Sequence, residues 1–229
     1  MADPQYDSLI ESYREQFREH GYSPKSLGWL KGKQDLRFET LTKDWNLEGK
    51  KILDVGCGFG DFVKFLNNRG VSNFSYVGVD VVDEFIEVGK REYEKNGVSF
   101  LKGSIEEVDL PSGLDLGIAS GAFNQRSDVT DCYEMVENIL RKMFDSCQIG
   151  IAVDFLTDRV DYRHEHNFNY SPEKILAIAY SLSRRVSLSN TTFPFEFSVT
   201  IYRDDSFNSA TTIFNSFELS QAQLKREVK

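Results

Sequence analysis

The chain has 229 residues, of which 40% are hydrophobic and 13% aromatic, so it is long and apolar enough to fold as one ordinary globular domain. Its formal net charge of −9 argues against a non-specific nucleic-acid binder, which needs a basic surface to neutralise phosphates. The three cysteines are widely spaced and match no zinc or disulfide pattern, and the sequence predicts neither a signal peptide nor a membrane span. We therefore expect a cytoplasmic protein that binds neither nucleic acid nor membrane; the oligomeric state is left open.

Two helices are predicted before the first strand. Apolar side chains between Tyr6 and Phe17 fall on one face of a helix that Gly21 would end. A turn-rich link containing Trp29 follows, and then a second helix is predicted at about 33–45, with Gln34 and Arg37 near its start. We treat residues 1–48 as an N-terminal helical segment.

The most informative stretch begins at residue 52. Residues 52–55 form a short apolar run that predicts a buried strand, and 61–69 carry apolar residues at helical spacing. Gly56, Gly58 and Gly60 stand between them. Glycine has no Cβ, so a loop of this kind lets the backbone approach a ligand closely, and the helix start offers free N–H groups.

The spacing of these glycines discriminates between ligands. A dinucleotide-binding loop has the pattern G-x-G-x-x-G, with the pyrophosphate on the helix N-terminus. Here the pattern is G-x-G-x-G, Asp54 precedes it by two residues, and Asp61 stands where the third glycine of the dinucleotide pattern would fall. A carboxylate there would repel a pyrophosphate and would suit a ligand that carries positive charge.

The D-x-G-x-G-x-G arrangement resembles motif I of the class I S-adenosylmethionine (SAM)-dependent methyltransferases. SAM carries a sulfonium and an ammonium instead of phosphates, and its product is S-adenosylhomocysteine (SAH). The resemblance implies that the cofactor contacts lie at Asp54, Gly56, Cys57, Gly58 and Gly60. It also implies that residues 1–48 cap the cofactor, with Trp29, Gln34 and Arg37 in the cap. Arg37 is a candidate for the methionine carboxylate, and a solvated surface position is an equal alternative.

The next two strands add further candidates. Residues 74–79 are predicted to form a strand that ends in Asp80, one strand-plus-helix unit after Asp54. An acid at this strand end can accept both hydroxyls of a ribose, and Asp80 with Val81 matches motif II of the family. After a third strand at 98–101, the family usually has an adenine-binding acid where this chain has Ser104. Ser104 can still hydrogen-bond, Glu106 can substitute for it or be merely solvated, and Ile105 can pack on the adenine face.

The fourth strand, at 114–119, leads into a loop that contains Ser120 and Asn124 and should border the reacting methyl group. The Asn/Asp-Pro-Pro-aromatic motif of enzymes that methylate nitrogens of adenine, cytosine or glutamine does not occur in the sequence. A helix at 129–144, a strand at 149–155, a helix capped by Ser171 and strands at 186–188 and 195–202 complete the prediction.

This order of elements predicts an α/β fold: a doubly wound, mostly parallel seven-stranded sheet with an antiparallel final strand, plus the N-terminal helical cap. The predicted domains are the cap at 1–48, the SAM-binding methyltransferase domain at 49–203 and a C-terminal tail at 204–229. The polar, aromatic segment 156–170 is the expected acceptor loop.

That loop supplies His164 and Tyr162 as candidate catalytic residues; in the loop after the fourth strand, Asn124 is a third candidate and Ser120 a predicted cofactor contact. His164, flanked by Tyr162, is the favoured general base for an acceptor that is still protonated at neutral pH. His166 and Asp154 are further candidates, and exposed loop histidines are the equally weighted alternative. No third ligand accompanies the two histidines, so the sequence predicts no metal site.

The predicted function is transfer of a methyl group from SAM to an oxygen or nitrogen of a small polar metabolite. A sugar or sugar nucleotide is one candidate, because 156–170 and 194–197 faintly resemble small methyltransferases encoded with bacterial surface-polysaccharide genes. The alternative is a catalytically silent SAM-fold protein with a binding or regulatory role. An NAD-linked oxidoreductase is disfavoured by the glycine spacing and by Asp61.

Overall fold

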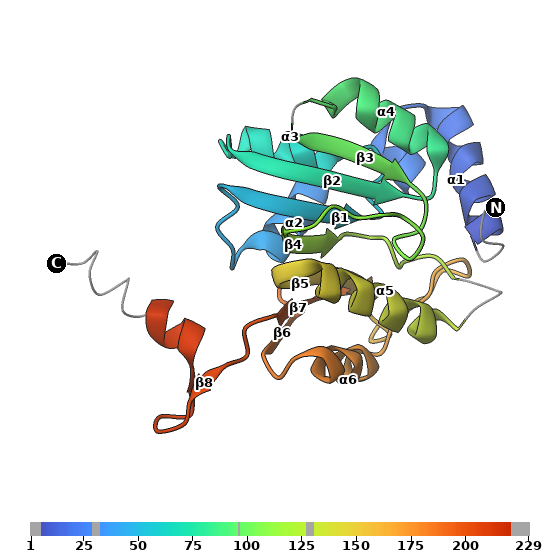
Figure 1. The fold of residues 1–229 in the computed structure, drawn as a ribbon. Helices are drawn as coiled ribbons and strands as arrows, with labels where there is room; N and C mark the ends of the chain where they lie inside the picture. The colour runs from blue at the N-terminus through green and yellow to red at the C-terminus, as the bar shows by residue number, and fades with distance from the viewer. Residues whose placement is uncertain (1–5, 29–32, 96, 127–130, 221–229) are drawn as a thin grey trace.

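The computed structural model describes residues 6–28, 33–95, 97–126 and 131–220. Its centre is a seven-stranded sheet of order β3-β2-β1-β4-β5-β7-β6 (Figure 1). The strands are β1 (Lys50–Val55), β2 (Phe74–Asp80), β3 (Val98–Lys102), β4 (Leu114–Ala119), β5 (Cys147–Leu156), β6 (Val186–Ser189) and β7 (Glu196–Tyr202). Strand β7 runs antiparallel to both of its neighbours, and the other recorded pairings are parallel. The predicted fold class is confirmed.

The helices are α1 (Asp7–His20), the short 3-10 helix η2 (Pro24–Leu27), α2 (Gln34–Thr42), α3 (Asp61–Asn68), α4 (Asp83–Tyr93), α5 (Cys132–Ser146) and α6 (Pro172–Leu182). Helices α2 to α6 lie on the two faces of the sheet, whereas α1 packs Tyr13 and Phe17 against Phe85 of α4. Side chains alternate between the faces of a strand, and β1 shows this directly. Ile52 packs with the cluster that contains α2, α3 and α4, whereas Leu53 and Val55 pack with the cluster that contains α5 and α6.

The starts of α5 and β7 differ from the sequence prediction. Helix α5 begins at Cys132, where the carboxylate of Asp131 accepts hydrogen bonds from the backbone of the first turn, and the predicted start at 129 lies outside the described residues. Strand β7 begins at Glu196, so Phe195, predicted as the first residue of this strand, precedes it and is 56% exposed. Trp29 also lies outside the described residues.

The strand order reverses between β1 and β4, which are neighbours in the sheet although two strands separate them in the chain. In open α/β sheets, ligands bind beyond the carboxyl ends of the strands at such a switch point. The loops after β1, β2 and β4 therefore meet at one edge.

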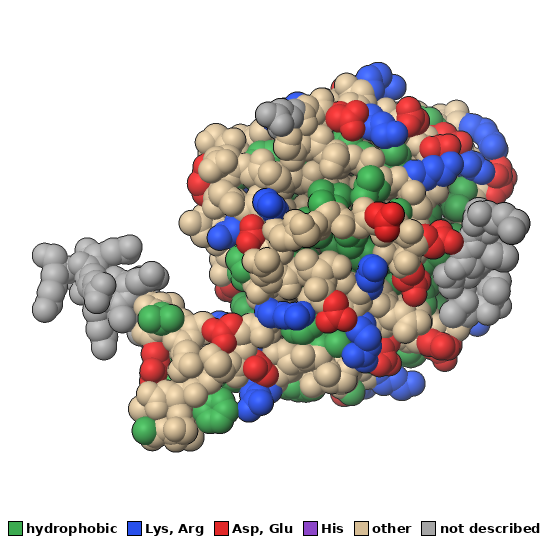
Figure 2. Space-filling view, viewed as in Figure 1, with side chains coloured by type: hydrophobic (Ala, Val, Ile, Leu, Met, Phe, Trp, Pro, Cys, Tyr) green, Lys and Arg blue, Asp and Glu red, His purple; other side chains and the backbone are tan. Residues whose placement is uncertain are grey.

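The chain beyond β7 leaves the body of the molecule. A small hairpin of β8 (Phe207–Asn208) and β9 (Ile213–Phe214) projects to one side in Figure 1. The guanidinium of Arg184 lies over the ring of Phe207, with 5.5 Å to its centroid. Hydrophobic side chains remain exposed along this segment (Figure 2), Phe217 and Leu219 among them. No helix in the described part of the chain is long and apolar enough to cross a membrane.

Candidate active site

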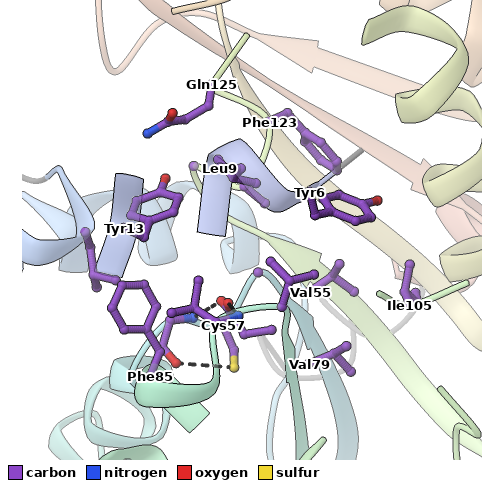
Figure 3. A pocket seen from close by; sticks show the side chains of 18 of the residues that line it. Tyr6, Leu9, Tyr13, Val55, Cys57, Val79, Phe85, Ile105, Phe123 and Gln125 are labelled. Atoms are coloured by element: carbon purple, nitrogen blue, oxygen red, sulfur yellow. Dashed lines mark hydrogen bonds between the residues drawn. The ribbon is translucent and has the colours of Figure 1, made fainter. Parts of the chain in front are cut away.

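A cavity opens at the switch point, where the loops after β1, β2, β3 and β4 converge beneath helix α1 (Figure 3). The cavity has a volume of about 140 Å³, counted as the space open to the centre of a water-sized sphere. One water needs roughly 10–15 Å³ by this measure, so the space suits an organic molecule.

The glycine loop forms the floor of the cavity. The N–H groups of Gly56 and Cys57 both donate to the carbonyl of Val79, at 2.8 and 3.1 Å, which holds the loop against β2. The φ angle of Gly56 is +69°, and a Cβ there would lie 2.6 Å from the Cβ of Ala122. Only glycine fits, because the loop after β4 presses directly on the loop after β1.

Asp80 connects the glycine loop to the end of β2. Its Oδ2 accepts a hydrogen bond from the Gly58 N–H at 2.8 Å, and its Oδ1 accepts one from the Val82 N–H at 2.9 Å. Burial raises the pKa of this carboxyl to about 6, and the hydrogen bonds from the backbone oppose the rise. A carboxylate has about four acceptor positions, so Asp80 keeps capacity for a further donor, and it lines the cavity.

Asp54 is a second acid in the same lining. It is 3% exposed, and its Oδ2 accepts a hydrogen bond from the hydroxyl of Tyr76 at 2.8 Å. Burial raises the pKa of Asp54 to about 7; the Tyr76 bond opposes this, and the charges of Asp80 and Asp61 add to it. Two buried carboxyls facing one cavity favour a ligand with positive charge.

Helix α1 covers the cavity with Tyr6, Leu9 and Tyr13 (Figure 3). The hydroxyl of Tyr13 is hydrogen-bonded to the side chain of Gln125, and burial raises the pKa of Tyr13 to about 12. The sequence correctly predicts that Tyr6, Leu9 and Tyr13 share one helix face, but it does not identify them as lining residues of the site. Their spacing is that of any buried helix face, so it carries no signal of the ligand.

Ten of the twelve predicted cofactor residues line this cavity. They are Gln34, Asp54, Gly56, Cys57, Gly58, Asp80, Val81, Ser104, Ile105 and Ser120. The structure thus brings them together, and their individual roles toward SAM remain predictions. It adds a group that the sequence did not suggest, including Phe123, Met135 and Ile139.

Gly60 is not among the lining residues. It stands at the N-terminus of α3 with φ of +79°, and a Cβ there would lie 2.5 Å from the ring of Phe100. The structure therefore gives this glycine a packing role between α3 and β3.

We expect Gly60→Ala to lower the free energy of unfolding by about 2 kcal/mol, since it combines left-handed strain with a clash against a buried ring. Gly70→Ala is the matched control, because Gly70 has φ of +76° and nothing within 4 Å of its Cβ position. Urea unfolding of both variants measures the difference. Equal losses would show that the Phe100 contact contributes nothing.

Arg37 also lies away from the large cavity. Its Nε donates to Glu196 Oε2 at 2.7 Å, its Nη2 contacts Oε1 of the same carboxylate, and its guanidinium lies over the ring of Phe193. It lines a second, smaller cavity with Asp154. Glu196 already accepts from the Arg37 guanidinium, so the methionine carboxylate of SAM would have to compete with Glu196 for this predicted contact.

The predicted catalytic residues lie outside the lining of the cavity. Tyr162 is 71% exposed and its ring contacts that of His164, with centroids 4.9 Å apart. Neither residue, nor Asn124, is among the described residues that line the cavity. The loop nevertheless runs beside the lining: the Phe168 N–H donates to the Asn124 carbonyl at 3.0 Å, and the Arg126 N–H to that of His166 at 3.0 Å. The roles of Tyr162, His164 and Asn124 therefore remain predictions that this geometry does not support.

Within the described residues, no cluster of three or more His, Cys, Asp or Glu side chains is placed to hold a metal ion.

Comparison with known proteins finds methyltransferases among the proteins similar to this chain. A family model described as a methyltransferase domain matches residues 46–152, which include the glycine loop and Asp80. A ubiquinone biosynthesis O-methyltransferase of Actinobacillus pleuropneumoniae is 30% identical over 105 residues, which are 45% of this chain and 42% of that protein. The match thus spans less than half the length of this curated relative.

Solved structures show the same fold. Magnesium protoporphyrin IX methyltransferase from Synechocystis with bound SAH has a TM-score of 0.61 and 13% identity, covering 86% of this chain and 95% of that chain. Human N-acetylserotonin methyltransferase in complex with SAM has a TM-score of 0.63 and 14% identity, covering 89% of this chain and 60% of that chain. Residues 46–152 thus match a methyltransferase domain, and the sheet order is that of the class I S-adenosylmethionine-dependent methyltransferase fold.

Proposed function

We propose that the protein transfers a methyl group from SAM to an oxygen or nitrogen of a small acceptor. The observation that carries the proposal is the placement of Asp54 and Asp80, two buried carboxyls, in one cavity with the glycine loop. When bound, SAM supplies an electrophilic methyl group on a sulfonium sulfur.

The residues of the cavity fit this cofactor. Asp80 keeps acceptor capacity for a ribose while its hydrogen bond from Gly58 holds the loop in place. Asp54 offers a negative charge, and Val81 and Ile105 offer apolar surface for an adenine. A dinucleotide fits less well, because the buried carboxyl of Asp54 lies beside the glycine loop, where its phosphates would bind.

The chain itself would act mainly by positioning. Holding two reactants in line lowers the barrier without a covalent step, and the described lining contains no histidine or lysine to serve as a base. Asp54, with a pKa raised to about 7 by burial, can accept a proton near neutrality.

The lining also favours one class of acceptor. Among the described lining residues, Arg126 is the only cation, whereas Tyr6, Leu9, Tyr13 and Phe38 present aromatic and aliphatic surface. A sugar nucleotide carries a diphosphate that needs several cationic partners, and the names of the relatives give the sugar hypothesis no support. We therefore propose an acceptor with an apolar or aromatic body and a hydroxyl or amine.

The first test is calorimetric titration of SAH into the purified protein, with NAD as the control. Micromolar binding of SAH without binding of NAD is the expected result. Binding of NAD alone would favour the oxidoreductase alternative. Incubation with methyl-labelled SAM and a panel of aromatic hydroxyl compounds, aromatic amines and sugar nucleotides then tests the acceptor class, and label in the sugar nucleotides alone would reverse our choice.

A second candidate function, SAM binding without transfer, is favoured by one observation. The predicted base His164 and its neighbour Tyr162 lie outside the described lining. Single-turnover incubation of the SAM complex with each acceptor class discriminates the two functions. Tight SAH binding with no labelled product from any class would favour the silent alternative.

A further inference from the structure

Asp154 connects the wall of the large cavity with the small cavity. It stands near the end of β5, is 6% exposed and lines the small cavity. Its Oδ2 accepts a hydrogen bond from the Ser120 hydroxyl at 2.8 Å, and its Oδ1 accepts one from the Gly121 N–H at 2.6 Å. Ser120 and Gly121 both line the large cavity, so one buried carboxylate holds part of the wall of the proposed active site.

The loop that Asp154 holds is the one that touches the glycine loop. Ala122 follows directly, and its Cβ occupies the space that a Cβ at Gly56 would need. A shift of the Ser120–Gly121 backbone would therefore move the contact with Gly56. Two hydrogen bonds and one van der Waals contact thus connect Asp154 to the glycine loop on the floor of the cavity.

On its other side, Asp154 faces a buried ion pair. Arg37 and Glu196 line the same small cavity, and their side chains are only 12% and 13% exposed. Burial raises the pKa of Asp154 to about 6; the Gly121 and Ser120 hydrogen bonds lower it, Glu196 raises it and Arg37 lowers it. The three charges therefore act on one another across the small cavity.

The ion pair also sets the position of α2. Arg37 lies within this helix, and Gln34 and Phe38, from the turn around it, line the large cavity. Glu196 is the first residue of β7 and lies 159 residues from Arg37 in the chain, so the ion pair fastens α2 to β7.

We infer that Asp154, Arg37 and Glu196 form one network of positioning residues that sets two walls of the cofactor cavity, the loop after β4 and helix α2. None of the three is a catalytic residue. The inference rests on the proposed function only in taking SAH as the probe of the cavity.

The coupling is tested without any ligand, by following the backbone amide of Gly121 in ¹⁵N-labelled protein from pH 4.5 to 8. Its N–H donates to Asp154, so its chemical shift reports the ionisation of that carboxyl. Glu196→Gln keeps an acceptor for Arg37 but removes the negative charge, and we expect the midpoint of the Gly121 shift to fall by at least about 0.5 pH unit. The Gly58 amide, which reports Asp80, should keep its midpoint. An unchanged Gly121 midpoint would overturn the network.

The positioning role is tested by SAH titration of Asp154→Asn. We expect about tenfold weaker binding, because a neutral amide accepts the Gly121 N–H less strongly than a carboxylate does and can keep Ser120 only by reversing the direction of that hydrogen bond. Glu48→Gln is the control: Glu48 also accepts backbone N–H bonds, from Ser72 and Asn73, but lies near the start of β1. Equal affinities of Asp154→Asn and the wild type would overturn the role. If the wild type does not bind SAH, the proposed function fails, but the Gly121 titration still tests the network. The Gly121 titration also tests the network if Asp154→Asn does not fold.

Discussion

Replacing Asp80 with asparagine is expected to lower the affinity for SAH about 100-fold, equivalent to about 3 kcal/mol. The wild-type carboxylate accepts two backbone N–H groups, from Gly58 and Val82, through different oxygens. Asparagine has one oxygen and one NH₂ group, so one of these N–H groups would face another donor. The glycine loop would lose its anchor, and a ribose would lose an acceptor at the same time.

The measurement is calorimetric titration of SAH, with the melting temperature taken to verify that the variant is folded. Asp115→Asn is the matched control, because Asp115 accepts a backbone N–H from Lys51 at the opposite edge of the sheet. We expect its affinity for SAH to equal that of the wild type. Retention of wild-type affinity by Asp80→Asn would remove Asp80 from the cofactor site.

The cofactor half of the site could be predicted because it is local in the sequence. Asp54, the glycines and Asp80 lie within 26 residues of one another, and the carboxyl ends of parallel strands meet at one edge of a sheet. Strand periodicity alone therefore brings Asp54 and Asp80 to the same cavity, as the structure shows.

The roles of single residues in that pattern were less predictable. Gly60 belongs to the same glycine series as Gly56 and Gly58, but the ring that excludes a side chain at Gly60 comes from Phe100 on β3. No spacing rule distinguishes a glycine required by a ligand from one required by a neighbouring side chain. The distinction needs the packing of distant strands.

The acceptor side could not be predicted, because it depends on contacts between remote segments. Arg37 looks like a free cation in the sequence, and its partner Glu196 lies 159 residues further on. Within the expected acceptor loop 156–170, residues 161–166 are exposed, whereas Thr157 and Tyr170 near its ends are buried. The backbone of this loop pairs with residues 124–126, and this pairing fixes which way the loop side chains point. As a result Gln125 and Arg126, and not the two histidines, line the cavity.

Replacing Asp54 with asparagine is expected to stabilise the fold while it weakens the binding of SAM. Burial raises the pKa of Asp54 in the folded protein from 3.8 to about 7. Between these values the folded state holds a proton that the unfolded state has released, so the free energy of unfolding falls as pH rises through this window. Above pH 7 the loss is complete. At pH 8 the variant, which has no charge to bury and keeps an oxygen for Tyr76, should be more stable by about 3 kcal/mol.

Binding should respond in the opposite direction. The sulfonium of SAM is attracted by the ionised carboxylate, so wild-type affinity should rise about tenfold between pH 6 and 7.5 as Asp54 loses its proton. The asparagine variant should bind SAM more weakly at pH 7.5. Its affinity for SAM should still change with pH near 6, because burial raises the pKa of Asp80 to about 6. Thermal unfolding and SAM titration across this range measure both effects.

A variant that is less stable at pH 8, or that binds SAM with the wild-type affinity and pH dependence, would contradict this account. Glu48→Gln, far from the cavity, should change neither quantity. A carboxylate whose removal stabilises the fold and weakens binding cannot be explained by packing. Its burial beside Asp80 raises the free energy of the empty protein, and a cationic ligand lowers it again, which is the reason to expect a positively charged cofactor in this cavity.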